Sequence, residues 1–142
     1  MFASALARNT AGSSSNAYRQ IGVETAATTA SPHQLVTMLS DGFRDSVDQA
    51  RGAIVAGRIE DKGRAIARAL RIVDEGLRAG LNLEAGGRLA ADLQSLYDYL
   101  MLRLSHANVH NDLAALEECT KLLEPVRSAW IAIAPKADGS AH

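Results

Sequence analysis

Ser31 opens the segment that most constrains the fold, because three signals for the start of a helix coincide there. Ser31 is suited to cap a helix, Pro32 takes the first helical position, and Gln34 is placed to complete a capping box. Apolar residues then recur every three or four positions until Gly57, a residue that favours the left-handed conformation at helix ends. The pattern predicts an amphipathic helix over 32–56.

The same apolar period returns in three further segments. The second predicted helix covers 59–81, and the third follows Gly86-Gly87 with a leucine stripe over 89–104. The fourth is capped by Asn111-Asp112 and ends near Ile133. Because the links are short and no strand pattern competes, the sequence predicts an all-α fold, an antiparallel up-down four-helix bundle.

Both ends of the chain differ in composition from the four apolar segments. Residues 1–30 and 135–142 are rich in small and polar side chains, which bury too little apolar area to offset the entropy of ordering. We therefore expect a flexible N-terminal arm over 1–30, with room for a short extra helix, and a disordered tail over 135–142. The bundle itself should occupy 31–134.

Pro125 interrupts the fourth segment and departs from the pattern of the other three. Proline removes one intrahelical hydrogen bond, and its ring crowds the preceding turn. The apolar stripe nevertheless continues beyond it through Val126, Ala129 and Trp130. We therefore predict a kink at Pro125 rather than the end of the helix.

Charge and cysteine content narrow the classes of function. The 142 residues include 15 basic and 16 acidic side chains, interleaved along the chain, which predicts no basic face for a phosphate backbone. The lone Cys119 suits a reducing compartment and is expected to be a buried apolar side chain. No apolar run approaches the ~18 residues that span a bilayer, and no signal peptide is evident in residues 1–15. We expect a cytoplasmic protein with no nucleic-acid partner and no membrane insertion.

No combination of residues predicts an active site. A carboxylate-bridged metal pair in a bundle needs Glu-x-x-His, and no glutamate here has a histidine three residues later. His106 and His110 could share a metal if a helix continued through them, but Asn108 and Asn111 indicate a helix end. His33 is either a phosphoryl acceptor or a polar residue of a first turn, and the second interpretation fits better. We expect no enzyme, no catalytic residue, no metal and no cofactor.

Apolar and small residues are more numerous than one core stripe requires. Those off the stripe are Val36, Met38, Val55, Ile72, Met101, Leu102 and Ile131, and the helix-internal glycines are Gly42, Gly52, Gly63 and Gly76. Each such glycine costs about 1 kcal/mol relative to alanine, which suggests close approach of another chain segment at some of them. Any one of these residues is best explained as core, but the set favours a groove that receives an apolar helix.

A series of short motifs follows a known order over nearly the whole predicted bundle. They are Tyr18-Arg19-Gln20-Ile21, Ser31-Pro32-His33-Gln34-Leu35, Asp41-Gly42, Lys62-Gly63, Leu96-Tyr97-Asp98-Tyr99, Arg103-Leu104, Ala107-Asn108, Asn111-Asp112 and Ala129-Trp130. In order and spacing they resemble the FliS family of flagellar secretion chaperones. One departure is Asp41, which follows Ser40 where many relatives carry an aromatic residue.

The resemblance implies a cytoplasmic export chaperone for the disordered C-terminal segment of flagellin. Binding would prevent premature polymerisation and deliver the subunit to the flagellar type III export apparatus, where a component of the export gate would be a second partner. Similar chaperones carry an arm tyrosine over the client's groove, and Tyr18 is the matching position. The residues expected to contact the client are Tyr18, Ile21, Met38, Leu39, Gly42, Phe43, Val47, Ile66, Ile72 and Val73.

Two alternatives remain open at this point. One is a self-associating structural bundle, or another helical adaptor without a flagellin client, and a homodimer would fit it. The other is an enzyme, either a metal bundle or a phosphotransfer domain, which stoichiometric metal or phosphate on His33 would favour.

Overall fold

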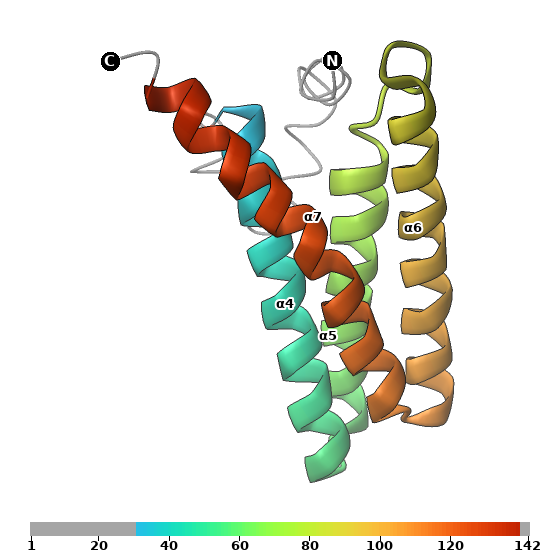
Figure 1. The fold of residues 1–142 in the computed structure, drawn as a ribbon. Helices are drawn as coiled ribbons and strands as arrows, with labels where there is room; N and C mark the ends of the chain where they lie inside the picture. Colours follow the sequence, from blue (N-terminus) through green and yellow to red (C-terminus); the bar gives the residue numbers. More distant parts are fainter. Residues whose placement is uncertain (1–30, 140–142) are drawn as a thin grey trace.

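Helical rods joined by short turns make up the computed structural model, which describes residues 31–139 of the chain and side chains up to Ala132. In chain order the elements are α4 (Pro32–Ala56), α5 (Ile59–Arg71), the π-helix η1 (Ile72–Arg78), α6 (Leu83–His110) and α7 (Leu113–Gly139). α5 and η1 form one rod, and successive rods run in opposite directions (Figure 1). The predicted antiparallel four-helix bundle is confirmed, and no strand occurs between residues 31 and 139.

The ends of α4 form as predicted from local sequence. The backbone N–H of Gln34 donates to Ser31 Oγ at 3.2 Å, and the N–H of Ser31 donates to Gln34 Oε1 at 2.8 Å, completing the capping box. Gly57 follows the last residue with φ +74°, a left-handed conformation that costs glycine little. The helix therefore has the predicted limits of 32–56.

The second rod ends earlier than the predicted 59–81, and its last part is a π-helix. Ala79 N donates to Asp74 O at 3.0 Å, a bond between residues five apart in the chain. Gly76 lies in this part, where an added Cβ would come within 2.9 Å of Leu39 Cδ2. A π-helical turn contains an extra residue. Apolar residues spaced by three and four are compatible with such a turn, so the apolar period in the sequence could not reveal it.

A short capped turn precedes the predicted third helix, and the fourth helix extends beyond its predicted end. α6 begins at Leu83, because the Asn82 side chain accepts the backbone N–H of Ala85 at 2.9 Å and caps the helix before the glycines. Gly87 (φ +57°) breaks the helical backbone, so the long part of α6 follows the glycines, as predicted. α7 continues through Pro125, as predicted, but reaches Gly139, since a helical backbone does not need the apolar stripe to continue.

The core lies between all four rods and contains large side chains from each. The largest fully buried ones are Trp130, Tyr97, Phe43, Leu39, Ile66, Ile72, Leu77, Leu100, Leu104 and Leu116. Cys119 is buried among them, and burial raises the pKa of its thiol to about 12. The thiol is therefore protonated at neutral pH, which confirms the prediction of a small buried side chain.

Lys62 links two corners of the bundle that are far apart in sequence. Its side chain is buried, and Nζ donates to the backbone oxygen of Asn108 at 2.9 Å and to Oδ1 of Asn111 at 2.7 Å. Asn111 has φ +53° and ends α6. The lysine thus connects the first turn of α5 to the turn between α6 and α7.

Replacing Tyr97 with phenylalanine should stabilise the bundle. Tyr97 is fully buried, its hydroxyl has no hydrogen-bond partner among the described residues, and burial raises its pKa. Removing an unpaired buried hydroxyl should add about 1 kcal/mol to the free energy of unfolding, measured by thermal unfolding with circular dichroism. Tyr99→Phe is the control, since Tyr99 is exposed and donates to Glu118 Oε2 at 2.7 Å. A loss of stability in Tyr97→Phe alone would show that the hydroxyl has a partner.

Candidate functional site

The residues expected from the sequence to contact a client fall mostly in the core. Six of them are at most 1% exposed, namely Leu39, Phe43, Val47, Ile66, Ile72 and Val73. A partner would reach these side chains only if the bundle opened. Met38 is half-buried and Gly42 is buried, while Tyr18 and Ile21 lie outside the described residues, where their role stays a prediction.

The helix-internal glycines divide into two kinds. At Gly42 an added Cβ would lie 3.3 Å from Ile72 Cδ1, and at Gly76 it would meet Leu39, so both allow close packing of α4 against the second rod. At Gly52 and Gly63 an added Cβ would meet no atom within 4 Å. The expected close approach therefore occurs at two of the four glycines, and it comes from side chains of this chain.

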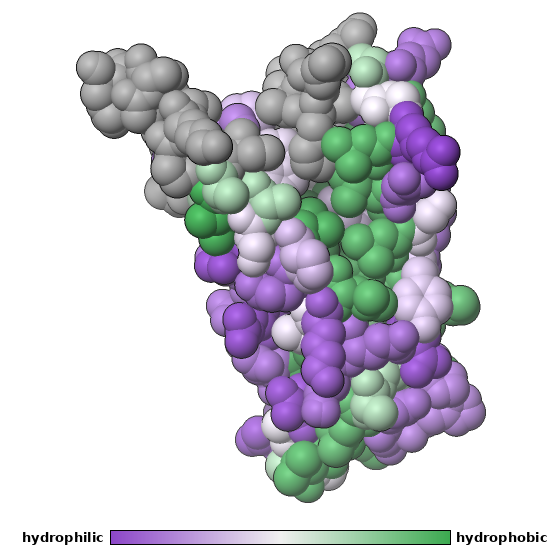
Figure 2. All heavy atoms as spheres, in the orientation of Figure 1, coloured by the Kyte–Doolittle hydropathy of each residue, from purple (hydrophilic) through white to green (hydrophobic). Residues whose placement is uncertain are grey.

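An apolar area lies on the surface between α7 and the N-terminal half of α6. Figure 2 shows it as green side chains beside the diagonal course of α7. Leu89 is 47% exposed, and Leu96, Leu122 and Val126 are half-buried against the core. These four side chains are called the α6–α7 apolar face below. Contiguous apolar surface of this kind is characteristic of binding sites.

Helical spacing shows that the members of this face lie on facing sides of the two helices. Arg103 Nε on α6 donates to Glu118 Oε1 on α7 at 2.8 Å, which identifies the side that each helix turns to the other. Leu96 precedes Arg103 by seven residues, and Leu89 precedes it by fourteen, so all three share one side of α6. The other two members follow Glu118 by four and eight residues on α7. The apolar face therefore continues the α6–α7 contact toward the opposite end of the bundle.

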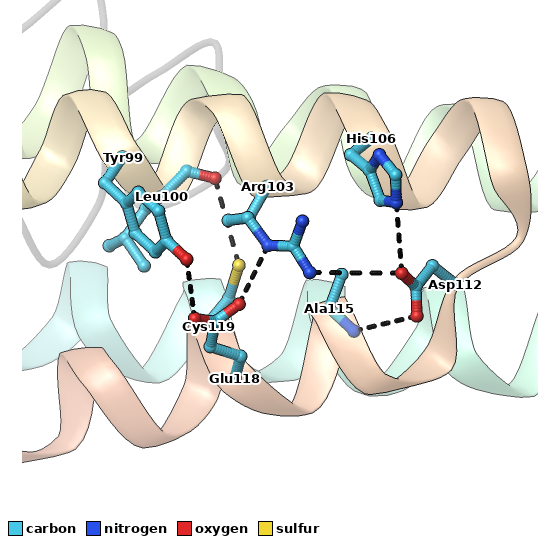
Figure 3. Close-up of polar contacts among 8 residues, drawn as sticks. All are labelled: Tyr99, Leu100, Arg103, His106, Asp112, Ala115, Glu118 and Cys119. Carbon is cyan, nitrogen blue, oxygen red and sulfur yellow. Dashed lines mark hydrogen bonds and ion pairs between the residues drawn. The ribbon is translucent and has the colours of Figure 1, made fainter.

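Polar contacts join α6 and α7 near the turn between them (Figure 3). Glu118 accepts hydrogen bonds from the hydroxyl of Tyr99 at 2.7 Å and from Arg103 at 2.8 Å. These two hydrogen bonds, with that of Tyr99 first, hold the pKa of Glu118 below its usual range. The carboxylate is therefore ionised at neutral pH, when both bonds are strongest.

Asp112 forms the second part of this polar contact. Its Oδ1 accepts the backbone N–H of Ala115 at 3.1 Å, capping α7, and its Oδ2 lies 3.1 Å from Nε2 of His106. The hydrogen bond from Ala115, followed by His106 and Arg103, lowers the pKa of Asp112. α6 does continue through His110, and the rings of His106 and His110 are 4.5 Å apart. Within residues 31–139, no three potential metal ligands come together.

The course of α7 leaves the apolar face open. Arg127 Nε contacts Asp41 Oδ1 at 2.7 Å, and Glu124 Oε1 lies 3.7 Å from Arg44 Nη1, so the second half of α7 is joined to α4. The first half is joined to α6 by Glu118. α7 therefore crosses from α6 to α4, as Figure 1 shows, and leaves the N-terminal half of α6 partly uncovered.

Sequence reasoning did not single out this face. Leu89 and Leu96 were assigned to the core stripe, and Leu122 was not noticed. The available signal was the spacing of seven from Leu89 through Leu96 to Arg103, which places two leucines beside a charged residue. Only the position of α7 shows that these leucines are half-exposed. No helix among the described residues has the length and apolar character needed to cross a membrane.

Comparison with known proteins agrees with this architecture. The family described as "Flagellar protein FliS" matches residues 14–137. "Flagellar secretion chaperone FliS" of Salmonella typhimurium is 46% identical over 121 residues, 85% of this chain and 90% of that protein. "Flagellar secretion chaperone FliSB" of Pseudomonas aeruginosa is 40% identical over 125 residues, 88% and 93% of the two chains. The Bacillus subtilis FliS is 32% identical over 114 residues, 80% of each chain. A match over most of the chain, at this identity, makes it a member of the FliS family of flagellar secretion chaperones.

Proposed function

We propose that this chain is a cytoplasmic export chaperone that binds the disordered C-terminal segment of flagellin. Binding would prevent premature polymerisation and deliver flagellin to the flagellar type III export apparatus, through contact with a component of the export gate. Membership of a family of secretion chaperones implies a secreted client. The observation that carries the rest of the proposal is the α6–α7 apolar face, which a client helix could cover.

The chemistry of the face suits an apolar helix rather than a small molecule. Its members lie on two helices that diverge, so a third helix could pack between them with its own apolar residues at spacings of three and four. A disordered segment that folds on this face would gain apolar burial against the entropy of ordering, without any need for a nucleotide. The N-terminal arm, with Tyr18, is proposed to compete for the same surface when no client is bound.

Leu89→Glu should weaken binding of a flagellin C-terminal fragment by about tenfold or more, because it places a charge within the α6–α7 apolar face. Isothermal titration calorimetry with the full chain would measure the dissociation constant. Leu102→Glu is a matched control, since Leu102 is a 66% exposed leucine of the same helix but not a member of the face. The control should bind within about twofold of the unchanged chain.

Equal affinity in both variants would contradict the placement of the client on this face. Absence of binding by the unchanged chain would contradict the flagellin client itself. Light scattering on the free protein separates a further alternative, because a stable homodimer that loses its contact in Leu89→Glu, and binds no fragment, would indicate a self-associating bundle.

A further inference from the structure

A second surface feature lies between α4 and α5, away from the apolar face. It is a groove of about 750 Å³ lined by Gln49, Gly52, Ala53, Arg58, Asp61, Arg64, Ala65, Ala67, Arg68 and Arg71. Four of these ten residues are arginines, and Asp61 is the only acid. The groove thus carries an excess of three positive charges in a chain whose net charge is -1.

The arginines are gathered by helical spacing and are only partly neutralised. Arg64, Arg68 and Arg71 lie four and then three residues apart, so they share one side of α5, and Arg58 precedes its first turn. Asp61 pairs with two of them, with Arg58 Nε at 3.5 Å and Arg64 in direct contact. Glu60 Oε1 also lies 4.0 Å from Arg64 Nη1. The side chain of Arg71 has no ion pair or hydrogen bond among the described residues. Two or more negative charges from a ligand are therefore needed to balance the groove.

Arg68 gives the groove a fixed central charge. Its Nη1 donates to the backbone oxygen of Gly42 at 3.1 Å and to Ser46 Oγ at 2.6 Å. These two bonds hold the guanidinium in place. A guanidinium that is already held in place loses less side-chain entropy when an anion binds.

The distribution of charge determines the class of ligand. From Arg58 to Arg71 the groove follows α5 for about 20 Å at ~1.5 Å per residue, farther than one phosphate or carboxylate can reach. The wall at Gly52 has open space where a side chain would otherwise stand, which lets a backbone approach. No aromatic side chain among the described residues lines the groove for stacking on bases.

We infer that the α4–α5 arginine groove is a docking site for an acidic polypeptide segment whose carboxylates are spread over several turns. Such a segment offers separate negative charges at intervals that match the arginines. Its acidic stretch need be no longer than the row of arginines. Its chemistry differs from that of the apolar helix proposed for the α6–α7 face. The two sites lie on different helix pairs, so one protein could hold a client and an acidic partner together.

The test uses the full chain and a synthetic peptide of about 18 residues, alanine with a glutamate at every fourth position. The same peptide with glutamine in place of glutamate is the uncharged comparison. Fluorescence anisotropy should show binding of the glutamate peptide only, weakening as the salt concentration rises from about 0.05 to about 0.3 M. Failure of the glutamate peptide to bind at low salt would overturn the inference.

Two variants locate the site. Arg71→Glu should weaken peptide binding by about tenfold, because it removes an unpaired positive charge and adds a repulsive one. Arg88→Glu makes the same charge change on a 93% exposed arginine outside the groove, with acids at Glu84 and Asp92 nearby, and should change affinity by less than about twofold. Equal weakening by both variants would mean that overall charge, rather than the groove, attracts the peptide.

A second pair of variants tests the shape of the groove without altering charge. Gly52→Gln fills open space on the groove wall and should weaken peptide binding by about fivefold or more, whereas Gly63→Gln fills open space outside the lining and should have little effect. Tighter binding of a thymidine oligonucleotide with the same dependence on Arg71 and Gly52 would assign the groove to nucleic acid instead. Flagellin-fragment binding should be unchanged in Arg71→Glu, so failure of either proposal is distinguishable from failure of the other.

Discussion

Ile72→Glu is expected to unfold the bundle, with a loss of more than about 4 kcal/mol in the free energy of unfolding. Ile72 is fully buried and packs close to Gly42, so a carboxylate there would lose its hydration. Met38→Glu should cost about 1–2 kcal/mol at most, because Met38 is half-buried and the new carboxylate can reach water. Urea unfolding followed by circular dichroism would measure both.

The pair also decides between two roles for residues that the sequence assigned to one groove. A folded Ile72→Glu variant that loses only flagellin binding would show that the bundle opens to expose this side chain. An unfolded variant would assign Ile72 to the core. The α6–α7 apolar face would then remain the proposed client site.

Lys62→Met should destabilise the chain by about 2–3 kcal/mol, although methionine has nearly the same length and is more apolar. The substitution would leave the backbone oxygen of Asn108 and the side-chain oxygen of Asn111 without the donor that they share. Thermal and urea unfolding would measure the loss. Lys121→Met is the matched control, since Lys121 is exposed, and it should change stability by less than about 0.5 kcal/mol.

A neutral Lys62→Met would mean that water replaces the ammonium group at this corner. In that case the two asparagines, rather than the lysine, would determine the geometry of the turn. The prediction is specific to this contact, because Lys62 and Asn111 belong to separate motifs of the sequence and meet only in the folded chain.

Local signals predicted the helices well where the interacting residues are close together in the sequence. Ser31 and Gln34 are three residues apart, so their capping box depends on no distant residue, and the limits of α4 were correct. The same reasoning missed the first turn of α6, which Asn82 caps. The two glycines do mark a break, at Gly87, and the long part of α6 follows it.

Charge patterns were harder to interpret because sign alternates along the chain. The interleaving of acids and bases suggested that no basic face exists, yet Arg64, Arg68 and Arg71 share one side of α5. Their spacing of four and three was present in the sequence. That α4 forms the opposite wall, with Gly52 leaving open space, follows only from the fold.

The sequence by itself determined the four helical segments, the main caps and the family, because these depend on neighbours in the chain or on the order of motifs. Only the tertiary structure decided which apolar residues are buried. Periodicity defines an apolar side relative to a helix's own axis, whereas burial depends on where the neighbouring helices lie. Ile72 lies off the apolar stripe and Leu96 lies on it, yet Ile72 is fully buried and Leu96 is half-exposed, because α7 crosses toward α4 and leaves part of α6 uncovered (Figure 1).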